Sequence, residues 1–146
     1  MRFGLVPVFG FALLAALGCA TSVFETTRSK QSALEEAQRK YTELVRWGEI
    51  ESASAYVDPE ISDAFIDAAA QFKDIRFTDF ESGPLQFGED SETATVSVVY
   101  RAYSTRSLVE KRFVEHQEWY REANSEYAWR VRPNLDSVAK KLNSTR

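Results

Sequence analysis

The chain has 146 residues, with 22 acidic and 18 basic side chains and a formal net charge of −4. A mildly acidic composition argues against a nucleic-acid-binding protein, because that class presents a basic face to phosphate groups. There is one cysteine and one histidine, so the chain has no second thiol for an internal disulfide and no His/Cys spacing typical of a metal site. We therefore expect neither a metal nor a cofactor.

The N-terminal stretch has the layout of an export signal. Every residue from Phe3 to Ala20 is apolar, Gly or Pro, and Arg2 is the sole charge before this run. Signal peptides combine a short positive start, an apolar core and small residues at the cleavage site. A membrane-spanning helix needs about 20 apolar residues and usually ends at charges that stop transfer, whereas this run ends without a basic cluster. The pattern predicts a removable signal over residues 1–18.

The only cysteine lies at the end of this signal. The segment Ala16-Leu17-Gly18-Cys19 resembles the lipobox of bacterial lipoproteins, although a Leu is usual where Ala16 stands and a small residue where Leu17 stands. The resemblance implies that the Cys19 thiol carries a lipid and that Cys19 becomes the N-terminus. It also implies the periplasmic face of the outer membrane, because Ala20 is not the Asp that retains such proteins at the inner membrane. The alternatives are an ordinary signal with a chance cysteine and an uncleaved anchor.

Helical patterns follow a short polar tether, which we place at residues 19–31. Ser32 and Glu35 match a capping box, and apolar residues then recur at helical spacing up to Gly48, a favoured left-handed stop. A second helix is expected over 49–57. A third is expected to start at Asp58 as the N-cap, with Pro59 as its first residue, and to run to about residue 72.

The period changes from helical to alternating at Ile75, which predicts strands. Phe80 breaks the phase of the first strand and suggests a bulge or a bend, and residues 88–91 are expected to form a turn. Further strands are expected over 94–102, 108–122 and 127–131, followed by a tail at 133–146 that permits a short helix.

The order of elements predicts an α+β domain over residues 32–132, with three N-terminal helices packed on a curved antiparallel sheet of about four strands. It resembles the nuclear-transport-factor-2-like (NTF2-like, SnoaL-like) cone in the helix ending Leu44-Val45-Arg46-Trp47-Gly48, the segment Tyr56-Val57-Asp58-Pro59 and the strand 127–131. A cystatin-like fold is the nearest competitor, but it normally offers one helix.

Candidate site residues are few, and no catalytic set is assigned. In NTF2-like enzymes, acids, His and Tyr lie inside the cone, which makes His116 the tempting residue; an exposed His paired with a neighbouring acid is the simpler interpretation. Six residues are candidates to line a pocket, although large aromatics can equally fill the cone: Tyr41, Tyr56, Tyr100, His116, Trp119 and Trp129. The charges of 110–122, Glu115 included, are expected on a solvated outer face with cross-strand ion pairs.

These patterns predict a bacterial envelope lipoprotein with a non-catalytic NTF2-like domain that serves as an interaction or accessory module. A homodimer or an envelope protein partner through the sheet is expected beside the membrane anchor. The alternative function is a small apolar ligand binder, or an isomerase-like enzyme, that uses the cone pocket.

Overall fold

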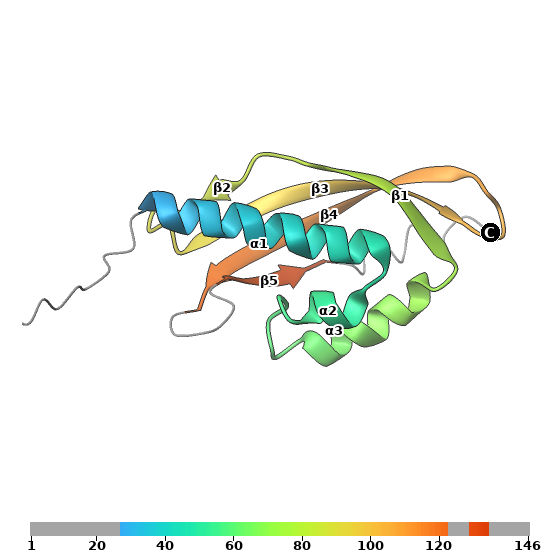
Figure 1. Cartoon of the computed structure of the whole chain (residues 1–146), viewed down its shortest axis with the longest axis horizontal. Coiled ribbons are helices and arrows are strands. Elements are labelled where there is room, and N and C mark those ends of the chain that lie inside the picture. Colours follow the sequence, from blue (N-terminus) through green and yellow to red (C-terminus); the bar gives the residue numbers. More distant parts are fainter. Residues whose placement is uncertain (1–26, 123–128, 135–146) are drawn as a thin grey trace, which may run out of the picture.

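A computed structural model describes residues 27–122 and 129–134. Helices pack against an open antiparallel sheet, so the α+β class is confirmed (Figure 1). The helices come first in the chain: α1 (Thr27–Trp47), α2 (Ile50–Ser54), α3 (Ser62–Ala69) and the 3-10 turn η1 (Ala70–Phe72). The strands follow: β1 (Ile75–Ser82), β2 (Gln86–Phe87), β3 (Thr93–Ser104), β4 (Glu110–Arg121) and β5 (Trp129–Pro133).

The first helix starts earlier than its sequence pattern suggests. The chain is already helical at Thr27, so the expected capping box at Ser32 and Glu35 lies inside the helix and part of the expected tether is helical. The C-terminal end is as predicted, because Gly48 adopts φ 75° and its N–H bonds to the carbonyl of Val45 at 3.1 Å. Together with the bond from Glu49 N to Leu44 O at 2.9 Å, this forms a Schellman stop, which satisfies carbonyls at the helix end.

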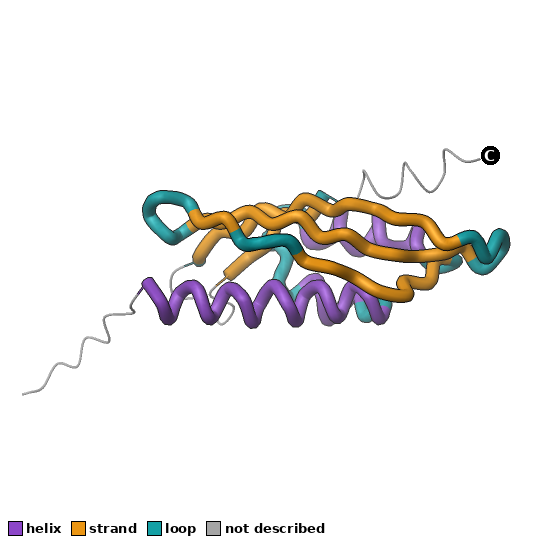
Figure 2. The backbone as a smooth tube through the Cα atoms, turned by 90° about the horizontal axis from the view of Figure 1, so that it is seen from above, coloured by secondary structure: helices purple, strands orange, loops and turns teal. Residues whose placement is uncertain are grey.

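The sheet has five strands in the order β1-β3-β4-β5, and β2 pairs with β3 beside β1. About four strands were expected, and the two-residue β2 is the additional one. The predicted bulge in the first strand is confirmed, because the β1–β3 register shifts between Phe77 and Asp79. A bulge bends its strand and increases the local twist, which helps the sheet curve over the helices. Figure 2 shows α1 lying along one face of this sheet.

The segment between α2 and α3 extends the sheet beyond β5. Val57 forms a parallel bridge with Val131, and Asp58 N donates to Val131 O at 2.9 Å while Val131 N donates to Tyr56 O at 2.8 Å. The edge of β5 is therefore covered. Asp58 does not cap α3 as expected: the helix starts at Ser62 after Ile61, and no side chain caps it.

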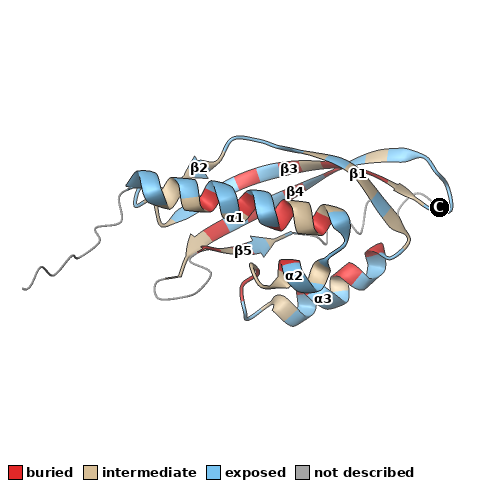
Figure 3. Ribbon diagram, in the orientation of Figure 1, coloured by how far each residue is buried: buried red, intermediate tan, exposed pale blue. Residues whose placement is uncertain are grey.

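The core lies between α1 and the concave face of the sheet, with buried positions along α1, β3 and β4 (Figure 3). Alternate residues of β3 point inward, as the sequence predicts: Ala94, Val96, Val98, Tyr100 and Ala102. Trp129 and Val131 of β5 share the inner face, also as predicted. The expected short helix of the C-terminal tail and the strand residues before Trp129 lie outside the described residues.

Candidate functional site

Glu115 is the centre of a polar cluster buried under α1. The hydroxyl of Tyr41 donates to its Oε1 at 3.0 Å, and the hydroxyl of Tyr100 donates to its Oε2 at 3.0 Å. Gln117 Nε2 also donates to Oε2, at 2.8 Å. Glu115, Tyr41 and Gln117 are completely buried, and Tyr100 is nearly so. We call these four residues the Glu115 cluster; α1, β3 and β4 each contribute to it.

A chain of hydrogen bonds extends the Glu115 cluster toward β1. Gln117 Oε1 accepts a bond from Trp119 Nε1 at 3.1 Å, and Gln117 Nε2 lies 3.5 Å from Thr42 Oγ1. Gln38 Nε2 then contacts both Thr42 Oγ1 and Ser82 Oγ at 3.0 Å. The interior therefore holds a connected polar network in which buried donors and acceptors satisfy one another.

The inward position of Glu115 corrects a prediction from the sequence. Glu115 was expected with the other charges of β4 on the solvated face, but the strand alternates and Glu115 shares its face with the buried Phe113 and Trp119. Side chains two residues apart on a strand point to the same side. The spacing of Glu115 from these two aromatics was therefore the signal that places it inside.

Burial governs the electrostatics of this cluster. Burial raises the pKa of Glu115 above its usual value of 4.5, and the hydrogen bonds from Gln117, Tyr100 and Tyr41 oppose that effect only in part. Burial and the nearby Glu115 also raise the pKa values of Tyr41 and Tyr100 well above 10.0. The donors around Glu115 are neutral, so nothing in the cluster compensates for a negative charge as a cation would.

A buried carboxyl with a raised pKa is a chemical type that enzymes use as a general acid or base. Such a group needs room for a substrate beside it. Here both oxygens of Glu115 accept hydrogen bonds and the side chain has no exposed area. In this arrangement the Glu115 cluster is a structural part of the core, because its hydrogen bonds connect α1, β3 and β4.

The aromatic candidates fill the interior. Tyr41, Tyr100, Trp119 and Trp129 are each at most 2% exposed. The rings of Tyr41 and Trp119 meet edge to face with centroids 5.8 Å apart, and the ring centroid of Phe65 of α3 lies 6.2 Å from that of Tyr41. The fifth aromatic candidate, Tyr56, is half-buried and packs against this core.

His116 lies apart from these residues, on the outer face of β4. It is exposed, and its Nδ1 lies 3.0 Å from Ser97 Oγ, a hydroxyl partner where an acid was expected. His116 lines two pockets of about 490 and 250 Å3. The structure therefore brings four of the six candidate residues together and separates His116 from them. Cys19, the candidate lipidation site, lies outside the described residues.

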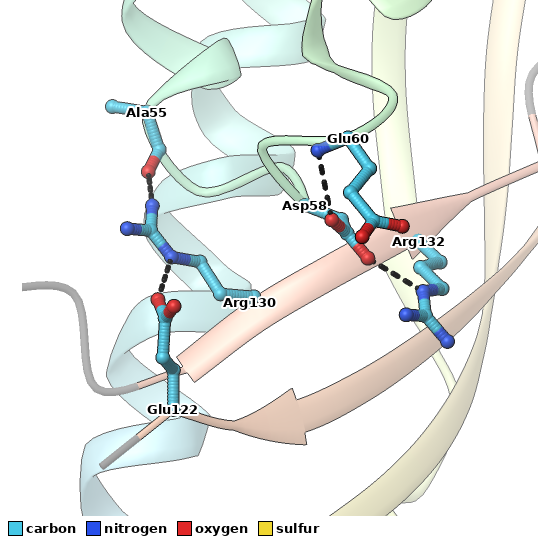
Figure 4. Close-up of polar contacts among 6 residues, drawn as sticks. All are labelled: Ala55, Asp58, Glu60, Glu122, Arg130 and Arg132. Carbon is cyan, nitrogen blue, oxygen red and sulfur yellow. Dashed lines mark hydrogen bonds and ion pairs between the residues drawn. The ribbon is translucent and has the colours of Figure 1, made fainter. Parts of the chain in front are cut away.

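A second buried carboxylate joins β5 to the α2–α3 segment (Figure 4). Asp58 is 2% exposed; its Oδ2 accepts a bond from Arg132 Nε at 2.7 Å, and its Oδ1 accepts one from Glu60 N at 3.0 Å. Burial raises the pKa of Asp58, but the bonds from Arg132 and Glu60 outweigh it, so the pKa lies below 3.8. We call Asp58, Glu60 and Arg132 the Asp58 clasp.

Arg130, two residues before Arg132 on β5, makes a similar pair of contacts beside the Asp58 clasp. Arg130 Nε donates to Glu122 Oε2 at 2.8 Å, and its NH1 donates to the carbonyl of Ala55. Arg130 and Arg132 thus bind the short β5 to the helical layer on which it packs (Figure 4).

Only some of the charged side chains on the outer sheet face contact a partner on a neighbouring strand. Arg101 lies 3.9 Å from Asp79, and Thr78 Oγ1 donates to Glu110 Oε2 at 2.9 Å. Arg101 is also directly opposite Arg112 in the β3–β4 register, where two like charges face each other. This face is solvated, as expected, and only some of its charges form the expected cross-strand pairs.

A cleft of about 860 Å3 opens where α1, α2, η1 and β1 meet. Trp47, the last residue of α1, stands beside it with 69% of its surface exposed. We call it the Trp47 cleft. Its walls are formed by Val45, Arg46, Trp47, Gly48, Glu49, Ile50, Glu51, Ser52, Ile66, Ala69, Ala70, Phe72, Lys73, Ile75, Arg76 and Phe77. This cleft was not predicted from the sequence, although Trp47 directly before Gly48 was a signal, since a helix stop places its last side chain near solvent.

Residues 27–122 and 129–134 contain neither a side-chain group suited to hold a metal ion nor a helix suited to span a membrane. Within these ranges no group of three or more His, Cys, Asp or Glu side chains is placed to hold a metal ion. None of the helices described is both long enough and apolar enough to cross a membrane.

Comparisons with known proteins bear on the fold alone. The sequence matches no protein-family model and no curated protein. The solution structure of a SEC-C motif containing protein from Rhodopseudomonas palustris is similar, with a TM-score of 0.55 and 14% identity over 73% of this chain and 82% of that one. The crystal structure of the intermembrane space region of the chloroplast protein ARC6 matches with a TM-score of 0.44 and 12% identity, over 75% of this chain and 95% of that chain.

Proposed function

We propose that this protein is a bacterial envelope lipoprotein, anchored through Cys19, whose NTF2-like domain is a non-catalytic interaction or accessory module. One observation carries the non-catalytic part. The space where an NTF2-like enzyme would hold its substrate is occupied by Tyr41, Tyr100 and Trp119. Both oxygens of Glu115, the acid that faces inward, are already bonded to protein donors.

The NTF2-like assignment is supported by the order and curvature of the elements. Three helices precede the strands, α1 lies in the concavity of the sheet, and the bulge in β1 bends the strand over it. The parallel bridge between Val57 and Val131 covers the edge of β5 with the α2–α3 segment. These features together favour a cone that is closed by its own side chains.

The filled interior is testable through the tryptophans. In a Trp47→Phe variant the remaining emission comes from Trp119 and Trp129, which are at most 2% exposed. We expect blue-shifted emission that resists quenching by acrylamide. Emission that acrylamide quenches readily in the folded variant would show an open cone and overturn the non-catalytic assignment.

The anchor is testable by labelling in a bacterial host. The full chain should incorporate radiolabelled palmitate and enter the membrane fraction, and Cys19→Ala should abolish the label. Ser22→Ala is the matched control and should keep it. The proposed outer-membrane location predicts that Ala20→Asp shifts the labelled protein to the inner-membrane band of a density gradient. Label that persists in Cys19→Ala would refute the anchor.

The outer sheet face is the proposed partner surface, either for a second copy or for another envelope protein. Val114 is an apolar residue on this face, directly opposite Val99 of β3, and is 37% exposed. A photo-reactive side chain at Val114 should give a discrete cross-linked product in cells, of dimer mass for a homodimer. The same group at the exposed Asp67 of α3 is the control and should give none.

A ligand-binding role is the second candidate. The raised pKa of Glu115 between two tyrosines favours the isomerase-like form of this idea, but that form requires the interior to open. The Trp47 cleft favours binding without chemistry, because it is already open to solvent.

A further inference from the structure

The Trp47 cleft is lined in large part by apolar side chains. Ile50 of α2, Ile66 of α3 and Phe77 of β1 approach it from different elements, and Ile66 is 36% exposed. Small-molecule sites are typically clefts of about 300 to 1,000 Å3 lined by apolar side chains with a few polar groups. The 860 Å3 of this cleft falls in that range.

Trp47 is the unusual residue of the cleft. The other two tryptophans that the structure describes, Trp119 and Trp129, are at most 2% exposed, whereas Trp47 is 69% exposed. The guanidinium carbon of Arg46 lies 4.8 Å from the centre of the Trp47 ring, in cation–π contact. Leaving a large aromatic surface in water has a cost in free energy, which a ligand covering the ring would recover.

The polar groups of the cleft carry an excess of positive charge. Eight of the fourteen lysines and arginines in residues 27–122 and 129–134 pair with a carboxylate, and Arg46, Lys73 and Arg76 are among the six that do not. Arg46 donates to Thr78 O at 2.7 Å, and Arg76 donates to the carbonyls of Lys73 and Ile75 at 2.9 and 3.0 Å.

Two acids, Glu49 and Glu51, also line the cleft. The three cations outnumber them, on a chain whose net charge is −4. The cleft therefore differs in sign from the protein as a whole, and charge complementarity favours an anion.

We propose that the Trp47 cleft binds a free, single-chain amphiphile with an anionic head, of the long-chain carboxylate type. The apolar lining takes the hydrocarbon chain, the Trp47 ring covers it, and Lys73 and Arg76 bind the carboxylate. This site is separate from the Glu115 cluster, and it does not depend on lipid attachment at Cys19.

The test uses a brominated amphiphile and the fluorescence of Trp47. The full chain carrying Cys19→Ala, which has no thiol to alkylate, is titrated with ω-bromoundecanoate. Bromine quenches only nearby indoles, so we expect saturable quenching and a blue shift that disappear in a further Trp47→Phe variant. The uncharged ω-bromoundecanol should bind roughly tenfold more weakly, because it lacks the ion pairs.

Charge variants locate the head group. The double substitution Lys73→Gln with Arg76→Gln should lower the affinity for ω-bromoundecanoate roughly tenfold. Arg112→Gln, which removes an exposed cation on the outer sheet face, is the matched control and should leave the affinity unchanged. Buried emission from Trp119 and Trp129 reports that each variant is folded.

Three results would overturn the proposal. The first is the absence of saturable quenching by ω-bromoundecanoate. The second is equal affinity for the carboxylate and the alcohol, since the cations would then have no part in binding. The third is quenching by vesicles of brominated phosphatidylglycerol without quenching by the free amphiphile, which would make the cleft a membrane-contact surface.

Discussion

Asp58 and Glu115 are both buried carboxyl groups, and their surroundings shift their pKa values in opposite directions. Asp58 accepts a bond from Arg132 at 2.7 Å, and its pKa lies below the usual value. Glu115 accepts bonds from two hydroxyls and one amide, and its pKa lies above the usual value. The comparison shows that burial alone does not decide the direction of a pKa shift: a cation with good geometry outweighs burial and lowers the pKa, whereas neutral donors compensate for burial only in part.

The largest expected effect comes from removing the acceptor inside the core. Glu115→Leu leaves the hydroxyls of Tyr41 and Tyr100 and the amide of Gln117 buried without their acceptor. We expect the free energy of unfolding to fall by about 3–5 kcal/mol, measured by urea unfolding with tryptophan emission. Glu115→Gln is the control and should change it by less than about 1 kcal/mol, because the amide can still bond to its neighbours. Equal stability of the Leu variant and the wild type would contradict a contribution from the network.

Breaking the Asp58 clasp should have a smaller effect. Asp58→Ala removes the acceptor of Arg132 and of Glu60 N, and we expect a loss of about 2 kcal/mol in the free energy of unfolding. Arg132 is half-exposed and can be solvated after the change, which limits the loss. The amide of Val131 should also exchange hydrogen faster, since it bonds to the same segment. Asp67→Ala, an exposed acid of α3, should stay within about 0.5 kcal/mol of wild type; a comparable loss there would mean that the clasp is not the cause.

The two carboxyls should affect the pH dependence of the free energy of unfolding in opposite directions. For Glu115, the folded state binds its proton more tightly than the unfolded chain does, so stability falls as the pH rises from about 4.5 to the raised pKa. For Asp58, the folded state binds its proton less tightly, so stability is present above pH 3.8 and is lost as the pH falls through the lowered pKa. Unfolding free energies between pH 3 and 9 should therefore decline above pH ~4.5 in wild type and not in Glu115→Gln. A matching decline in that variant would assign the effect elsewhere.

The smallest effect is expected for two like charges that face each other on the solvent-exposed side of the sheet. Arg101 and Arg112 are directly opposite each other on the exposed face, where solvent screens their repulsion. Arg112→Glu should stabilise the fold by roughly 0.5 kcal/mol, and Arg112→Gln by less. Added salt should remove the difference, and a gain that persists at high salt would point to packing.

The local patterns of the sequence determined the elements well. Three- and four-residue spacing predicted α1 up to Gly48, and alternation predicted β3 and the inner face of β5. These predictions succeed because the periods of helix and strand depend on neighbours only a few residues away. The start of α1 at Thr27 was missed because a capping box at Ser32 is compatible with a helix that already runs through it.

The sequence by itself also determined that the interior would be aromatic, and it predicts an export signal that ends at the single cysteine. Only the tertiary structure decided which polar group meets which. Tyr41 and Glu115 are 74 residues apart in the chain, and so are Asp58 and Arg132. No local period connects residues at such separations. Their contacts, and the direction in which the pKa of each carboxyl is shifted, follow from how the sheet curves over α1 and from where β5 pairs with the α2–α3 segment.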